Sequence, residues 1–175
     1  MSGIVNQTGA KSGVIGTTVG TPSSKILQVV STTLITDTST ASHATNFNDI
    51  AGLSVTITPA ATSSKVLVMY SIVGTAQGGQ AYIRLIRADG VINVGTQRSL
   101  RTPVSLGNFY NAGGTQTMTH ADQYLDSPST TSATVYKLQG WVDSGSFFYN
   151  RSHNDSNSNS HPNATSSITV MEIGA

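Results

Sequence analysis

Short runs of β-branched and apolar residues, separated by Gly, Pro, Ser and Asn, dominate this sequence after residue 24. The predicted strands are 25–34, 52–58, 65–73, 81–87, 91–94, 122–125, 133–142, 147–150 and 167–173. No segment has a convincing 3.6-residue apolar period, so no helix is expected. Because many short strands separated by turn residues are typical of sandwiches and jelly rolls, the sequence predicts an all-β fold, a β-sandwich or jelly roll with an extended N-terminal arm.

The run KVLVMYSIV at 65–73 is nearly continuous in apolar residues, which predicts a strand at the centre of a sheet and covered on both faces. A hairpin is expected at 81–94, where Ala88-Asp89-Gly90 supplies the positive φ angles of a tight turn. Arg84 and Arg87 fall on opposite faces of the first strand of that hairpin. The segments 98–119 and 150–163 show no period and predict long surface loops.

The first 24 residues are rich in Gly, Ser and Thr, with isolated apolar side chains between them. These apolar residues are Ile4, Val5, Val14, Ile15 and Val19. We therefore expect two parts, an extended docking arm at 1–24 and a β-sandwich domain at 25–175. Ordering some twenty residues costs on the order of 20 to 40 kcal/mol of backbone entropy, which only extensive docking offsets. The hypothesis is that the arm adds main-chain hydrogen bonds and apolar side chains to a neighbouring subunit; a flexible tail is the alternative.

Charged residues form 10% of the chain and the net charge is +1, whereas soluble proteins have about 25% charged residues. Lys and Arg are scattered, so nucleic acid is not an expected partner. The chain has no cysteine, which leaves no disulfide and no Cys zinc site. The N-terminal residues lack the pattern of a signal peptide, and no apolar run approaches about 18 residues. We expect a soluble protein, made in a cytoplasm, with no membrane partner.

The acidic residues and the four histidines are dispersed without catalytic spacing, so no enzymatic activity is expected. His120 and Asp122 have the spacing of a base and its orienter, but such a spacing is common by chance. The run 155–159 begins like a calcium loop, yet Ser160 and Ser166 stand where that loop needs Gly and Glu. Neither a metal nor another cofactor is expected.

Aromatic residues gather between positions 136 and 149. Tyr136, Trp141 and Phe148 are candidates for stacking on sugar rings or for packing in the interior or at a subunit interface, and packing is the favoured interpretation. Strand alternation places Trp141 on the same face as Lys137 and Gln139.

Four segments are similar to a known group of proteins. They are SGIVNQTGAKSGVIG at the N-terminus, LDSPSTTSATVYKLQ, NRS with the Asn/Asp/Ser run after it, and SSITVMEI. The chain resembles small structural proteins in the virions of tailed bacteriophages that infect aquatic hosts, over nearly its whole length. This resemblance implies a β-sandwich virion component, commonly a homotrimer, with no cofactor. Members of the group occur as head decorations, head fibres or parts of tail fibres.

The compact size and the absence of shaft repeats favour a decoration or cement module, or a head fibre, on the capsid surface. Such a module would dock through its arm onto the major capsid protein or another virion protein. The alternative is a tail-fibre or adhesin module that binds a host polysaccharide.

Overall fold

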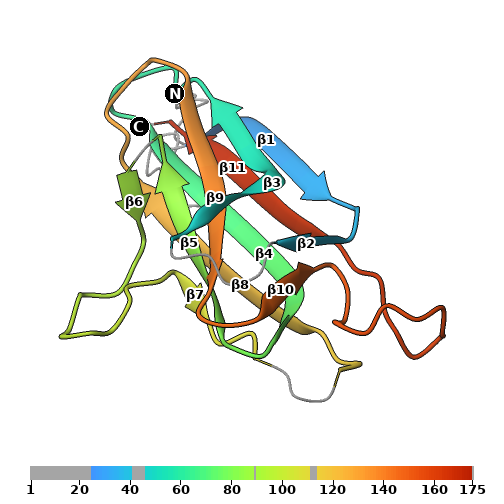
Figure 1. Ribbon diagram of the computed structural model, residues 1–175. Helices are drawn as coiled ribbons and strands as arrows, with labels where there is room; N and C mark the ends of the chain where they lie inside the picture. Colours follow the sequence, from blue (N-terminus) through green and yellow to red (C-terminus); the bar gives the residue numbers. More distant parts are fainter. Residues whose placement is uncertain (1–24, 41–45, 89, 111–113, 175) are drawn as a thin grey trace, which may run out of the picture.

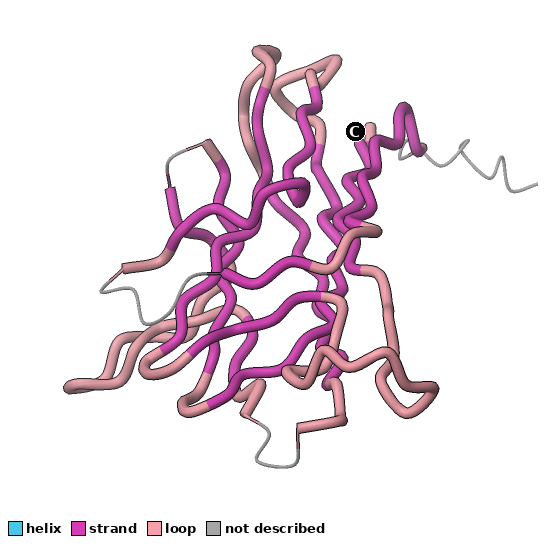
Figure 2. Tube along the Cα trace, turned by 45° about the vertical axis from the view of Figure 1, so that its right-hand side comes forward, coloured by secondary structure: helices cyan, strands magenta, loops and turns pink. Residues whose placement is uncertain are grey.

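The structure, a computed structural model, describes residues 25–40, 46–88, 90–110 and 114–174. The expected arm, with Ile4, Val5, Val14, Ile15 and Val19, lies outside the described residues. In the described part every regular element is a strand, and no helix is long and apolar enough to cross a membrane (Figure 2). The prediction of an all-β fold is confirmed.

The described strands form two antiparallel sheets that lie one over the other (Figure 1). In chain order they are β1 (Ile26–Leu34), β2 (Thr38–Thr40), β3 (Asn48–Ile57), β4 (Lys65–Gln77), β5 (Ala81–Arg87), β6 (Gly90–Ile92), β7 (Leu106–Gly107), β8 (Met118–Asp126), β9 (Thr134–Val142), β10 (Ser146–Tyr149) and β11 (Ser166–Ile173). Sheet A contains β1, β11, β4 and β8, with β10 and β2 continuing it beside the second half of β4. Sheet B contains β3, β9 and β5, and β6 and β7 pair with the edge of β5 that faces away from β9.

The order of the strands is that of a jelly roll. When the short strands β2, β6 and β10 are set aside, sheet A holds the first, eighth, third and sixth of the remaining strands. Sheet B holds the second, seventh, fourth and fifth. Successive strands therefore pass between the two layers, except that the fourth and fifth lie side by side in sheet B. Along most strands inward residues that are buried alternate with outward residues that are less buried. Inward-facing residues of both sheets form one core, including Leu53, Ile57, Val66, Val68, Ile83, Leu85, Leu138, Ile168 and Val170.

β4 lies at the centre of sheet A, as the sequence predicts, because it pairs with β8 on one side and with β11 and then β10 on the other. It is covered on both faces only from Ile72 to Ala76. In its first half burial alternates, and Leu67 and Met69 are half-buried on the outer face. At this end of β4 the amide of Ala76 hydrogen-bonds to the carbonyl of Phe109, so the chain around residue 109 runs beside the strand there.

The segment 98–119 was expected to be a surface loop, and the structure differs in three respects. β7 (Leu106–Gly107) pairs with β5, β8 begins at Met118 within the segment, and Phe109 is not exposed. The side chain of Phe109 is fully buried and packs on Phe147 with the ring centroids 5.0 Å apart. A single buried aromatic residue produces no periodic pattern, so the sequence could not mark it.

The expected hairpin is present, since Arg87 pairs with Gly90 between β5 and β6. The positive φ of 50° in this turn belongs to Ala88, and residue 89 lies outside the described part. Arg87 reaches inward to Asp126, whereas Arg84 lies on the outer face of β5. The prediction that the two arginines occupy opposite faces is confirmed.

Candidate functional site

The structure does not bring Tyr136, Trp141 and Phe148 together. Tyr136 faces inward from β9 and is fully buried. Trp141, on the same strand, is half-buried on the outer face of sheet B. Phe148 lies on the outer face of β10 in sheet A, where the guanidinium of Arg151 stands 4.5 Å from its ring centroid. Alternation along the strands separates these side chains, so three different surroundings replace the single cluster that the sequence suggested.

Trp141 is the centre of an aromatic row across the outer face of sheet B. Tyr82 on β5 is its cross-strand partner, and their rings stack with centroids 5.3 Å apart and planes 22° apart. Phe47, just before β3, lies on the other side of Trp141 with a centroid distance of 5.6 Å. Antiparallel pairing of β5 and β3 with β9 places the three rings in one row.

Polar side chains line a shallow hollow next to this row. Its volume is about 320 Å³, and it is lined by Asn46, Phe47, Arg84, Thr102, Gln139 and Trp141. The hollow therefore combines aromatic surface with amide, hydroxyl and guanidinium groups, which is the composition that small-molecule sites commonly have.

Arg84 is the charged member of the hollow. Its guanidinium carbon lies 3.8 Å from the ring centroid of Phe47, and its Nε donates a 3.1 Å hydrogen bond to the carbonyl of Pro103. Partial burial lowers the pKa of Arg84 from its ordinary value. Asp49 stands near but is already engaged, since Lys137 and Gln139 donate hydrogen bonds of 2.8 and 2.7 Å to its two oxygens.

The outer face of sheet A has a different chemistry. The side chains of Leu125, Leu67, Met171 and Val29 form one register row across β8, β4, β11 and β1. Leu125 and Val29 have 52% and 53% of their surface exposed. We call this set the apolar row of sheet A. Two parallel rows beside it carry only uncharged side chains, and they are Gln123, Met69, Thr169 and Ser31, and Ala121, Ser71, Ser167 and Thr33.

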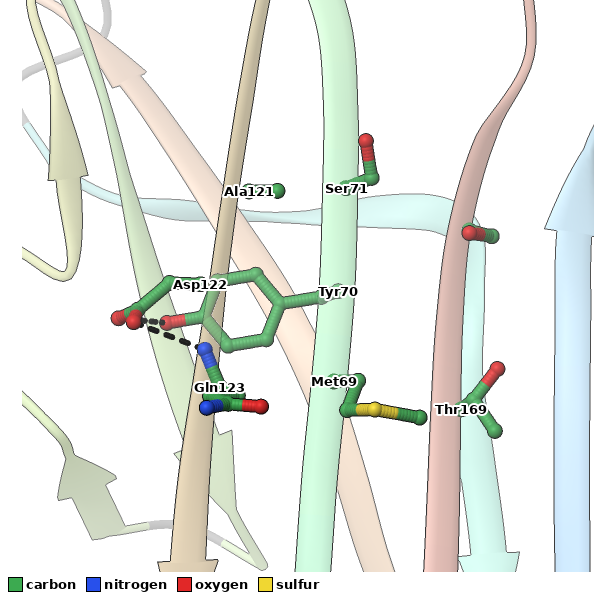
Figure 3. Close-up of a pocket in the computed structure, with 8 residues that line it drawn as sticks. Met69, Tyr70, Ser71, Ala121, Asp122, Gln123 and Thr169 are labelled. Carbon is green, nitrogen blue, oxygen red and sulfur yellow. Dashed lines mark hydrogen bonds between the residues drawn. The ribbon is translucent and has the colours of Figure 1, made fainter.

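A shallow hollow of about 570 Å³ lies over these uncharged rows (Figure 3). Met69 extends toward Thr169 along its floor, whereas the ring of Tyr70 meets Asp122. The hydroxyl of Tyr70 donates a 3.1 Å hydrogen bond to Oδ2 of Asp122, which also accepts a 2.7 Å bond from Nδ2 of Asn93. Burial raises the pKa of Tyr70 to about 12, so its hydroxyl stays protonated at neutral pH.

The spacing of His120 and Asp122 does not produce a hydrogen-bonded pair between these two described residues. The imidazole of His120 packs on Phe109 with ring centroids 4.2 Å apart, and burial lowers its pKa. Asp122 is held by Tyr70 and Asn93 instead. Each side chain therefore has its own structural partners.

The segment 150–163 is a loop, as predicted, and its charged groups are paired within it or with nearby chain. Asp155 lies 3.7 Å from Arg151, and Nδ1 of His161 lies 2.9 Å from the hydroxyl of Ser156. In the part of the chain that the structure describes, no three His, Asp or Glu side chains converge on a metal site.

Sequence reasoning found Trp141 but not Tyr82, Phe47 or Arg84 as its neighbours. The outward positions of β5 carried a signal, since Tyr82 and Arg84 are large polar residues in a strand whose other residues, apart from Arg87 at its end, are apolar. No local feature of the sequence indicated which strand would pair with β5.

No protein-family model matches the chain, and no curated protein matches it in sequence. Among solved structures the chain is similar to a "Structure of infectious bursal disease virus Gx strain", with 14% sequence identity and a TM-score of 0.38. That match covers 83% of this chain and 41% of the viral chain, so the chain spans less than half the length of its structural neighbour.

Proposed function

We propose that this protein is a non-enzymatic structural component of a bacteriophage particle. In this proposal it is a decoration or cement module, or a head fibre, on the capsid surface, and it assembles as a homotrimer. Its arm, Met1 to Ser24, docks onto the major capsid protein or another virion protein. The bacteriophage part of the proposal rests on the resemblance of the four sequence segments.

The observation that carries the assembly part is the apolar row of sheet A. β1, at the edge of this sheet, follows the arm directly and exposes Ile26, Leu27 and Val29. Contiguous exposed apolar surface on a soluble domain marks an interaction site. A neighbouring copy that covers the row would bury it. Few charges would need to lose their hydration, because the two rows on one side are uncharged and Lys65 is the charged member of the register row on the other side.

The non-enzymatic part is supported by what the described carboxylates do. Asp126 is paired with Arg87, and Asp49 is paired with Lys137. Glu172 accepts hydrogen bonds from Gln28 and from the amide of Ala60. These groups hold the two sheets and their connections in place.

Sedimentation velocity of the full chain tests the assembly. The wild type should sediment with a mass three times that of the 18.2-kDa chain. Leu125→Glu, which places a charge in the apolar row, should sediment with the mass of a monomer. Thr119→Glu is the matched control, because it adds the same charge on the outer face of the same strand at the far end from the row. A monomeric wild type, or equal behaviour of the two variants, would contradict the proposal.

A second function, a tail-fibre or adhesin module for host polysaccharide, is favoured by the aromatic row of sheet B. Labelled antibody against the purified protein separates the two functions on intact particles. Many sites spread over the head support decoration, and a few sites at the tail support host binding.

A further inference from the structure

The hollow beside Trp141 has a charge that the surrounding residues do not balance. Arg84 is half-buried, and among the described residues no carboxylate lies within 4.0 Å of its guanidinium. Its hydrogen bond to the carbonyl of Pro103 uses Nε, and no described carboxylate pairs with its two Nη groups. Half-burying a cation without an anionic partner is costly, so such a group in a hollow is a candidate to bind an anion.

The nearby acid does not fill this role. Asp49 receives hydrogen bonds from Lys137 and Gln139, and Lys137 matches its charge. The hydrogen bond from Lys137 has the larger effect and that from Gln139 adds to it, and together they lower the pKa of Asp49 and keep it ionised. Taken together, Asp49, Lys137 and Arg84 leave one positive charge at the edge of the hollow.

The remaining walls select the kind of anion. Trp141 and Phe47 supply apolar aromatic surface, and Asn46, Gln139 and Thr102 supply amide and hydroxyl groups. A sugar ring has an apolar face of C–H groups and a rim of hydroxyls, which this combination of aromatic and polar walls suits. A guanidinium beside it favours a ring that carries a carboxylate, because Arg binds carboxylates through paired N–H groups.

We propose that this hollow on the outer face of sheet B binds a uronic acid residue of an acidic polysaccharide, with the sugar ring against Trp141 and its carboxylate on Arg84. The site does not depend on the capsid docking proposed above. It names the sugar class for the second, polysaccharide-binding function, and it can fail without affecting the trimer or the position of the protein on a particle.

Intrinsic fluorescence reports on this site directly, because Trp141 is the chain's one tryptophan. Titration of the full-length protein with tetragalacturonate should give a saturable change in emission. Its methyl ester, which has the same rings without the charge, should bind at least about tenfold more weakly. Tetraglutamate at the same concentrations should give no saturable change, which separates an acidic glycan from an acidic peptide.

Variants test the assigned residues. Arg84→Gln should weaken tetragalacturonate binding at least about tenfold, and Trp141→Ala, followed by calorimetry, should abolish it. Lys65→Gln is the control for loss of a positive charge, since Lys65 lies in β4 of the other sheet. Thermal unfolding of each variant checks its fold, and the comparison of acid with ester uses only the wild type.

Four results with the wild type and Arg84→Gln would each overturn the proposal. They are no saturable response to the uronate, equal binding of acid and ester, equal binding of tetraglutamate, and an Arg84→Gln protein that is folded and binds like the wild type. An effect of Lys65→Gln as large as that of Arg84→Gln would reduce the binding to a general charge effect and would also reject the site.

Discussion

The hydroxyl of Tyr136, on β9 of sheet B, donates a 2.6 Å hydrogen bond to Oδ2 of Asp126, at the end of β8 in sheet A. Asp126 is 3% exposed, and its charge is balanced by Arg87, whose Nη1 lies 2.8 and 3.0 Å from its two oxygens. The two layers are thus joined by a polar contact at one end of the sandwich. A buried carboxylate is tolerated there because both of its oxygens have donors.

Tyr136→Phe should lower the free energy of unfolding by about 1 to 3 kcal/mol, because Oδ2 of Asp126 loses a buried donor. Urea denaturation followed by tryptophan fluorescence measures the change. Tyr110→Phe removes the same hydroxyl from an exposed side chain and should change stability by no more than about 0.5 kcal/mol. Equal effects of the two variants would contradict the role of the contact.

Glu172 should make stability depend on pH in the acid range. Burial alone raises its pKa, but hydrogen bonds from Gln28 and from the amide of Ala60 outweigh burial and hold the pKa below 4.5. The unfolded chain then binds a proton at higher pH than the folded chain. The stabilisation is complete above about pH 4.5 and is lost as the pH falls through the folded-state pKa.

Urea midpoints of the wild type and of Glu172→Gln between pH 7 and pH 3 test this dependence. At neutral pH the urea midpoint of the wild type should be higher than that of Glu172→Gln. The difference between the two midpoints should become smaller as the pH falls below the ordinary pKa of a glutamate. If the difference between the midpoints became larger at low pH, folding would raise the pKa of Glu172 instead of lowering it.

Gly140→Ala should destabilise the protein by about 1 to 3 kcal/mol, as overpacking in a core does. A Cβ at Gly140 would collide with the phenol oxygen of Tyr149, a rigid ring that is 1% exposed. Gly95→Ala is the control, because a Cβ there meets no atom within 4 Å. Thermal unfolding should show a lower midpoint for Gly140→Ala than for Gly95→Ala. A similar loss of stability in both variants would show that the chain relieves the collision by a small shift.

Asn150 should be one of the least replaceable residues of the loop after β10. It is fully buried with a φ of 62°, its Nδ2 donates to the carbonyls of Leu34 and Thr36, and its Oδ1 accepts from Ser166. Asn150→Ala strains the backbone and leaves buried groups without partners, each costing about 1 to 3 kcal/mol.

Asn108→Ala separates these two causes. Asn108 has a φ of 68° but is exposed, so its replacement costs only the backbone strain, about 1 to 2 kcal/mol. Chemical denaturation should therefore rank Asn150→Ala well below Asn108→Ala in stability. If the two losses match, the hydrogen bonds of Asn150 contribute nothing measurable.

Most of the strands could be predicted from the sequence, because alternation and turn residues are local signals. It identified the central position of β4 and the hairpin of β5 with β6, and it placed Arg84 and Arg87 on opposite faces. The same period of two already puts Tyr136 and Trp141 on opposite faces of β9, so their separation was contained in the sequence.

The neighbours of each outward side chain, in contrast, follow from how the strands pair in the folded chain. Trp141 meets Tyr82 and Phe47 because β9 pairs with β5 and β3, strands far from it along the chain. In the same way the apolar row joins Val29 of β1 to Met171 of β11, near opposite ends of the described sequence. Pairing between distant strands depends on the packing of the whole core, and no local pattern of residues encodes it.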